Sequence, residues 1–237
     1  MSDKKDIFRF KQFAVAQEQT AMKVGTDGVL LGAWADIKTA ENILEIGTGT
    51  GLIALMCAQR QPPANIDAIE IEPTAARQAT ENFKNSGWSE RLHLIQIDFK
   101  LFVTEEKYDV IISNPPYFDE KTLNPDKQRN LARHNQQLPL STLISRAKKI
   151  LKPDGNIQLI LPVDKLNDLK HICHREQLTL NKICYVRGHT TAKVKRILVK
   201  ISGIATPLKE KHLIIEHARH RYTEDYIRLT RDFYLKM

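Results

Sequence analysis

The alternation of short apolar runs with helical stretches in residues 42–161 constrains the fold of this chain most. Strands that alternate with helices pair in parallel, and right-handed crossovers then place helices on both faces of the sheet. The strands are expected at residues 42–46, 66–71, 92–97, 108–113 and 156–161, and the helices at 52–59, 73–86 and 138–151. The pattern predicts a doubly wound α/β fold.

The last part of the chain is expected to complete this sheet. One more helix is expected between residue 163 and about residue 177, and a final helix at 222–235; β-rich segments are expected at 180–187, 194–202 and 213–216. We predict a mostly parallel, seven-stranded sheet with helices on both faces. A chain of 237 residues without linkers or repeats fits one domain. Its parts are an N-terminal cap at 1–42, a cofactor-binding core at 43–162 and a basic C-terminal part at 163–237.

The positive charge is concentrated in the last quarter of the chain. Residues 182–237 contain 13 basic and 5 acidic residues, which equals the net charge of +8 of the whole sequence. A solvated basic face would explain such a cluster, but it is also the electrostatic footprint of a protein that binds a polyanion.

The segment Glu45-Ile46-Gly47-Thr48-Gly49-Thr50-Gly51 joins the first strand of the core to its first helix. Glycines there permit a tight turn and a close approach of a ligand to the backbone, next to the free N–H groups of a helix N-terminus. A dinucleotide fingerprint would need glycine at position 52, where the chain has Leu52. The spacing instead resembles the S-adenosylmethionine loop of class I methyltransferases, and Glu45 stands where that family more commonly has Asp.

Two further acids follow the next two strands. Glu70 ends the second strand and is placed to accept hydrogen bonds from both ribose hydroxyls of a cofactor, with Glu72 as the competing candidate. Asp98 ends the third strand and is followed by Phe99. By resemblance, Asp98 would accept a hydrogen bond from the adenine amino group of the cofactor, and Phe99 would pack on the ring.

The tetrapeptide Asn114-Pro115-Pro116-Tyr117 follows the fourth strand, at the sheet edge where such folds bind ligands. The side-chain carbonyl of Asn114 and the backbone carbonyl of Pro115 can each accept one N–H of a planar amine and hold its nitrogen in line with a methyl group. The prolines fix the backbone and pre-set Asn114 in an extended conformation. Tyr117 can stack on the target ring, a contact worth roughly 1–3 kcal/mol.

This tetrapeptide resembles the amino-methyltransferases within class I, which include adenine-N6 enzymes and enzymes that methylate a glutamine amide. The chain is similar over nearly its whole length to the bacterial tRNA1(Val) (adenine-37-N6)-methyltransferase family. The segments that carry this resemblance are residues 10–13, 22–32 and the tail at 222–234. In the upstream segment, Thr26 or Asp27 is expected to cap a helix, and the resemblance adds Lys23 and Thr26 to the cofactor site. The cofactor contacts are then expected at Lys23, Thr26, Glu45, Gly47, Thr48, Gly49, Gly51, Glu70, Asp98, Phe99 and Asn114.

The resemblance implies methylation of the adenine beside the anticodon of a valine tRNA. A loop base of this kind is splayed out at a cost of a few kcal/mol. Residues expected to contact the anticodon stem-loop are Arg129 and Arg133, in the loop after the tetrapeptide, and Arg187, Lys193, Lys195, Arg196 and Lys200, in the basic quarter.

Other classes of function fit less well. A protein-glutamine methyltransferase would use the same tetrapeptide but leaves the basic quarter unexplained, and a non-catalytic RNA-binding module leaves the intact loop and tetrapeptide unexplained.

The histidines at 171 and 174 have no second ligand pair, so no metal is expected. No run reaches the ~20 apolar residues of a membrane span, and no signal peptide is evident. Three cysteines without a CxxC pair fit reduced thiols, and we expect a cytoplasmic monomer.

Overall fold

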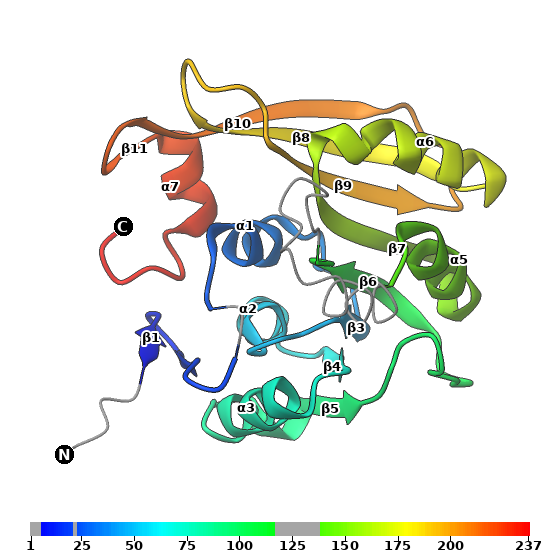
Figure 1. The fold of residues 1–237 in the computed structure, drawn as a ribbon, viewed down its shortest axis with the longest axis horizontal. Helices are drawn as coiled ribbons and strands as arrows, with labels where there is room; N and C mark the ends of the chain where they lie inside the picture. Colours follow the sequence, from blue (N-terminus) through cyan, green and yellow to red (C-terminus); the bar gives the residue numbers. More distant parts are fainter. Residues whose placement is uncertain (1–5, 21–22, 117–137) are drawn as a thin grey trace, which may run out of the picture.

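The computed structural model describes residues 6–20, 23–116 and 138–237 (Figure 1). Its strands are β1 (Ile7–Arg9), β2 (Ala14–Ala16), β3 (Asn42–Ile46), β4 (Asn65–Glu70), β5 (Leu92–Gln96), β6 (Tyr108–Ser113), β7 (Leu151–Pro162), β8 (Thr179–His189), β9 (Arg196–Ser202), β10 (Lys209–Ala218) and β11 (Arg221–Tyr222). Its α-helices are α1 (Thr26–Trp34), α2 (Leu52–Arg60), α3 (Pro73–Lys84), α5 (Leu140–Ile150), α6 (Leu166–Arg175) and α7 (Glu224–Thr230), and short 3-10 turns lie at Ser89–Arg91 and Val163–Lys165.

One central sheet has the strand order β11-β10-β8-β9-β7-β6-β3-β4-β5. The five strands β7, β6, β3, β4 and β5 pair with one another in parallel. β9 runs antiparallel to both β7 and β8, and β10 is parallel to β8. The doubly wound, mostly parallel α/β fold is therefore confirmed. The described sheet has nine strands and not seven, because all of the expected β segments join it and β11, which was not expected, pairs with β10.

Helices cover both faces of this sheet, as expected (Figure 1). The side chains of α1, α2 and α3 belong to one hydrophobic core, whereas those of α5 and α6 belong to a second core on the other face. The predicted helices agree with the structure within a few residues, except the last one. That helix ends at Thr230 and is followed by turns, so it is shorter than the expected 222–235.

The first and last segments of the described chain pack against each other. The β1–β2 hairpin is followed along the chain by α1, and Phe10 forms a β-bridge with Tyr234. The Phe10 ring lies 4.6 Å from that of Phe13 and 5.8 Å from that of Tyr234, measured between centroids. The backbone N–H of Lys11 donates to the carbonyl of Phe233 at 2.8 Å. The hairpin is thus held by the end of the chain.

Two helix starts near the glycine loop differ in how they are capped. The N-cap residue of α1 is Gly25, and no side chain caps this helix, so the expected cap from Thr26 or Asp27 is wrong. The start of α3 agrees with expectation, with Pro73 in its first turn. The carboxylate of Glu72 caps α3 by accepting hydrogen bonds from the backbone N–H groups of Thr74 and Ala75.

The three cysteines, Cys57, Cys173 and Cys184, are buried free thiols. Burial raises the pKa of Cys57 to about 12 and that of Cys173 to about 11, so both thiols stay protonated near neutral pH. In the described part of the chain, none of the helices has the length and apolarity that a bilayer crossing requires.

Candidate active site

The glycine loop between β3 and α2 adopts a backbone that favours glycine. Gly47, Gly49 and Gly51 have φ values of 74°, 57° and 84°, in the left-handed region that other residues seldom adopt. The N–H groups of Gly47 and Thr48 donate to the carbonyl of Ile69 at 2.8 and 3.0 Å, which fixes the loop to the end of β4. The loop is therefore held against the end of β4.

The three glycines meet different surroundings. A Cβ atom on Gly47 or Gly49 would meet no atom within 4 Å, whereas a Cβ on Gly51 would lie 2.5 Å from the Phe83 ring. Gly51 is also the N-cap residue of α2. Gly47 and Gly49 therefore leave room for a ligand, and Gly51 lets α3 pack closely against the start of α2.

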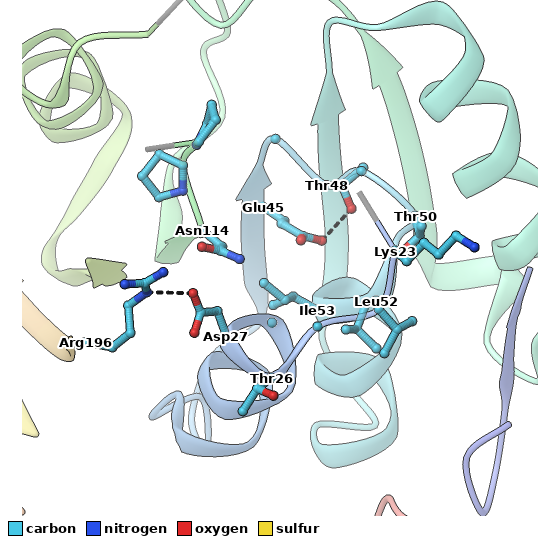
Figure 2. A pocket seen from close by; sticks show the side chains of 17 residues that line it. Lys23, Thr26, Asp27, Glu45, Thr48, Thr50, Leu52, Ile53, Asn114 and Arg196 are labelled. Atoms are coloured by element: carbon cyan, nitrogen blue, oxygen red, sulfur yellow. Dashed lines mark hydrogen bonds and ion pairs between the residues drawn. The ribbon is translucent and has the colours of Figure 1, made fainter. Parts of the chain in front are cut away.

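A cavity of about 450 Å³ lies between the glycine loop, the start of α1 and the end of β6 (Figure 2). Its walls combine backbone of the loop with a small number of charged and amide side chains. The lining residues are Lys23, Val24, Gly25, Thr26, Asp27, Gly28, Glu45, Gly47, Thr48, Gly49, Thr50, Leu52, Ile53, Asn114, Pro115, Pro116 and Arg196. The structure thus brings the glycine loop and the described part of the proline tetrapeptide into one cavity.

Glu45 is a carboxyl group buried at the wall of this cavity. Its Oε2 atom accepts hydrogen bonds from the Thr48 hydroxyl at 2.6 Å and from the Ala54 N–H at 2.9 Å. The pKa of Glu45 is raised to about 8, mainly by burial; the two hydrogen bonds oppose this rise, and the charge of Glu70 adds to it. A cation bound in the cavity would favour the ionised form of this carboxyl group.

Glu70 and Glu72 have different partners. Glu70 accepts hydrogen bonds from the N–H groups of Gly49 at 2.8 Å and of Ile71 and Glu72 at 2.9 Å, so its carboxylate lies directly against the glycine loop. Glu72 is engaged as the cap of α3. This geometry favours Glu70 over Glu72 as a ligand for ribose hydroxyls, although Glu70 is not part of the cavity lining.

Asp98 and Phe99 do not line the first cavity. Asp98 accepts a hydrogen bond from the N–H of Lys100 at 2.8 Å and pairs with the ammonium group of Lys100 at 3.3 Å. Phe99 is buried, lines a second cavity of about 270 Å³ and lies 5.9 Å from the guanidinium of Arg146. Among the expected cofactor residues, Gly51, Glu70, Asp98 and Phe99 are therefore the ones that the first cavity does not include.

Asn114, Pro115 and Pro116 enter the cavity directly after β6. The hydroxyl of Ser113 donates to the carbonyl of Ile46 at 2.7 Å, which ties the end of β6 to the end of β3. This bond sets the tetrapeptide beside the glycine loop. Tyr117, Arg129 and Arg133 lie outside the described residues, so their predicted roles in base stacking and RNA binding stay predictions.

Arg196 and Asp27 form a pair inside the cavity that the sequence did not predict. Arg196 was expected to bind RNA, and Asp27 was considered only as a helix cap. In the structure, the Nε of Arg196 donates to Oδ2 of Asp27 at 2.7 Å inside the cavity (Figure 2). No local motif predicts this pair, because it depends on β9 and α1 meeting in three dimensions.

The other predicted RNA-binding residues lie outside the cavity. Lys193 and Lys195 are exposed in the connection between β8 and β9. Lys200 pairs with Asp36 at 2.8 Å, and Arg187 is half-buried on β8. Within the described ranges, no group of three or more His, Cys, Asp or Glu side chains is placed to hold a metal ion.

Known proteins resemble this chain in sequence and in fold. Residues 21–168 match the methyltransferase small domain family. A tRNA1(Val) (adenine(37)-N6)-methyltransferase of Parabacteroides distasonis is 46% identical over 235 residues, which cover 97% of this chain and 98% of the relative. The chain belongs to the tRNA1(Val) (adenine(37)-N6)-methyltransferase family. The family resemblance seen in the sequence is thereby confirmed.

Solved structures share the fold of this member of the tRNA1(Val) (adenine(37)-N6)-methyltransferase family. A predicted O-methyltransferase of Agrobacterium tumefaciens has a TM-score of 0.69 at 21% identity and covers 87% of this chain and 96% of its own. A glycopeptide N-methyltransferase complexed with (S)-adenosyl-L-methionine has a TM-score of 0.56 at 12% identity, with coverage of 77% and 90%. At these identities the likeness establishes the fold alone.

Proposed function

We propose that this protein transfers the methyl group of S-adenosyl-L-methionine to N6 of adenine 37 in tRNA1(Val). The observation that carries this proposal is the single cavity lined by the glycine loop on one side and by Asn114, Pro115 and Pro116 on the other. A donor of a methyl group and an acceptor amine must meet in one place, and this cavity offers a surface for each.

The residues around the glycine loop fit S-adenosyl-L-methionine. Gly47 and Gly49 leave open space above the loop, and Glu45 offers a carboxyl group for a cationic ligand. Glu70 lies against the loop at the end of β4, where a carboxylate can accept both ribose hydroxyls. When bound, the cofactor supplies a methyl group on a positively charged sulfur, so no metal is needed to activate it.

The tetrapeptide supplies acceptors for the target amine. An exocyclic adenine amine is a weak nucleophile because its lone pair is delocalised into the ring. We propose that the side-chain carbonyl of Asn114 and the backbone carbonyl of Pro115 accept its two N–H groups, which would orient the nitrogen lone pair toward the methyl group. Tyr117 is proposed to stack on the adenine ring, as the sequence predicts.

The basic quarter of the chain supports an RNA substrate. Lys193 and Lys195 are exposed and available to phosphates, whereas Arg196 reaches the cavity itself. We expect the anticodon stem-loop to bind across these residues, with the target base turned into the cavity. A tRNA substrate supports a cytoplasmic location, and we expect the protein to act as a monomer.

The test is methyl transfer from labelled S-adenosylmethionine into unmodified tRNA, with nucleoside analysis of the product. Wild type is expected to form N6-methyladenosine in one valine tRNA, and Asn114→Ala is expected to lower the rate by about 10²–10³. Asn65→Ala, at the exposed start of β4, is the matched control and should leave the rate unchanged. Full activity of Asn114→Ala would contradict the proposal, and label in a protein fraction but not in tRNA would favour a glutamine methyltransferase.

A further inference from the structure

Lysines from three neighbouring strands form a row across one face of the sheet. Lys182 on β8 is the register partner of Lys200 on β9 and also of Lys209 on β10. Residues paired in register present their side chains on the same face. Lys211 lies two residues after Lys209 and therefore on this face as well. We call Lys182, Lys200, Lys209 and Lys211 the lysine row.

The lysine row lies beside the C-terminal end of α1. The ammonium group of Lys182 is 4.6 Å from the centre of the Trp34 ring, and Lys200 pairs with Asp36 at 2.8 Å. Trp34 is the last residue of α1 and is half-buried. The row is thus supported by an aromatic ring, and its surface is open at Lys209 and Lys211, which are exposed.

The arrangement of charges in the row is unfavourable for the protein alone. Lysines that face each other across strands repel, and within the described ranges the row forms one ion pair, between Lys200 and Asp36. Burial lowers the pKa of Lys182; the charges of Lys211 and Lys200 lower it too, while Asp36 raises it. A bound anion would relieve this repulsion.

Protection of a sheet edge does not account for the row. Lysines on edge strands prevent sheets from pairing with each other, which would explain Lys209 and Lys211 near the edge. Lys182 and Lys200, however, lie on β8 and β9, which are paired with strands on both sides. Interior strands have no free edge to protect, so these two lysines need another explanation.

We propose that the lysine row binds backbone phosphates of the RNA stem that leads to the target base. The inference rests on the proposed function, because it assigns a surface to the same RNA substrate. Arg196 of the cavity and Lys200 of the row lie four residues apart on β9, about 13 Å along the strand. An RNA stem can therefore span from the cavity to the row, and its regularly spaced phosphates match a row of ammonium groups.

The test measures the salt dependence of tRNA binding. The variant Lys182→Gln/Lys209→Gln/Lys211→Gln is compared with wild type and with Lys84→Gln/Lys149→Gln/Lys170→Gln, a control that removes three exposed lysines of α3, α5 and α6. The row variant is expected to bind tRNA at least about tenfold more weakly at physiological salt. Its slope of log K against log salt should be shallower by about 2.7, since each of the three lost phosphate contacts removes about 0.9. Affinity for S-adenosylmethionine should be unchanged.

The outcomes separate this inference from the proposed function. Equal slopes for the row variant and the control variant would overturn the inference, whether or not tRNA is methylated. A shallower slope without any methylation of tRNA by wild type would support the row and contradict the proposed function. Lys209→Gln/Lys211→Gln changes exposed positions only, so a loss of affinity in this variant has no folding explanation.

Discussion

Arg196 on β9 donates from its Nε atom to Oδ2 of Asp27 on α1 across 2.7 Å, and both residues line the cavity beside Asn114 (Figure 2). The two side chains are 38% and 36% exposed, so the pair contributes about 0–1 kcal/mol to stability. Its larger effect is on the charge of the cavity, because the carboxylate offsets the guanidinium where a cationic cofactor is expected to bind.

Substitution of the two partners is therefore expected to shift cofactor affinity in opposite directions. Asp27→Asn leaves the guanidinium unbalanced and should weaken S-adenosylmethionine binding severalfold, since like charges then meet in the cavity. Arg196→Gln leaves the carboxylate unbalanced and should keep or strengthen this affinity while weakening tRNA binding. Calorimetric titration measures the first ligand, and a filter-binding titration measures the second. Equal effects of both variants on cofactor affinity would contradict this account.

Cofactor affinity is expected to depend on pH through Glu45. The pKa of this carboxyl group is raised to about 8, so the free protein holds it protonated near neutral pH. A bound cation favours ionisation, so affinity should rise as pH increases from 6 to 7.5, by at most about tenfold per pH unit. Glu45→Gln should abolish this part of the pH dependence. Calorimetry at pH 6.5 in two buffers of different ionisation enthalpy should detect proton release from wild type only.

The same carboxyl group affects stability with a defined sign. The pKa of Glu45 rises from 4.5 to about 8 on folding, so the folded state holds the extra proton between these values. Its contribution to the free energy of unfolding therefore falls as pH rises through this window. Glu45→Gln should lose this trend in urea titrations at several pH values. A parallel pH dependence in both proteins would show that Glu45 is not buried in its uncharged form.

Two glycine substitutions in one loop are expected to act differently. Gly51→Ala adds a Cβ atom 2.5 Å from the Phe83 ring at a φ of 84°, so it should lower the free energy of unfolding by about 2–4 kcal/mol. Gly49→Ala meets no atom and should cost about 1–2 kcal/mol from its φ alone. Because Gly49 lines the cavity and Gly51 does not, Gly49→Ala should weaken cofactor binding more than Gly51→Ala does, relative to the stability that each variant loses. Urea unfolding and calorimetric titration provide the two quantities.

Substitutions of Glu70 and Glu72 should distinguish cofactor binding from the capping of α3. Glu72→Ala removes the cap of α3 and is expected to cost about 1 kcal/mol of stability, with little change in cofactor affinity. Glu70→Ala removes the carboxylate beside the glycine loop and should weaken cofactor binding about tenfold or more. Thermal melts and cofactor titrations of both variants make the comparison. A larger affinity loss in the Glu72 variant would assign the ribose contact to that residue.

The parts of the fold that the sequence predicts are those set by local patterns. Periodic apolar runs locate β3 to β7, and Pro73 marks the start of α3, because these signals lie within a few residues of each other. The length of β10 was underestimated because Lys209 to His212 is polar and has no apolar alternation, although it pairs with β8. The last helix was overestimated because its continuation bridges to Phe10, a contact that no local pattern contains.

The candidate site also has residues that local patterns predict and residues that depend on tertiary contacts. Glu45 lies near the end of β3, and Gly47, Gly49 and Asn114 come soon after strands, so their shared position at one sheet edge could be predicted. The pairing of Asp27 with Arg196 could not, since 169 residues separate them along the chain. Asp98 and Phe99 follow β5 as expected, yet their side chains lie outside the first cavity, because Asp98 bonds within its own turn and Phe99 packs into the core.

The bridge between Phe10 and Tyr234 also bears on how the chain matures. A ribosome delivers Phe10 long before Tyr234, so the aromatic side chains of the hairpin wait for this partner while the strands of the central sheet are synthesised. A product that stops before Tyr234 lacks this contact, so the Phe10 ring is more exposed, and exposed apolar surface favours aggregation. Closure of the hairpin against the last turns therefore requires synthesis of the chain through Tyr234.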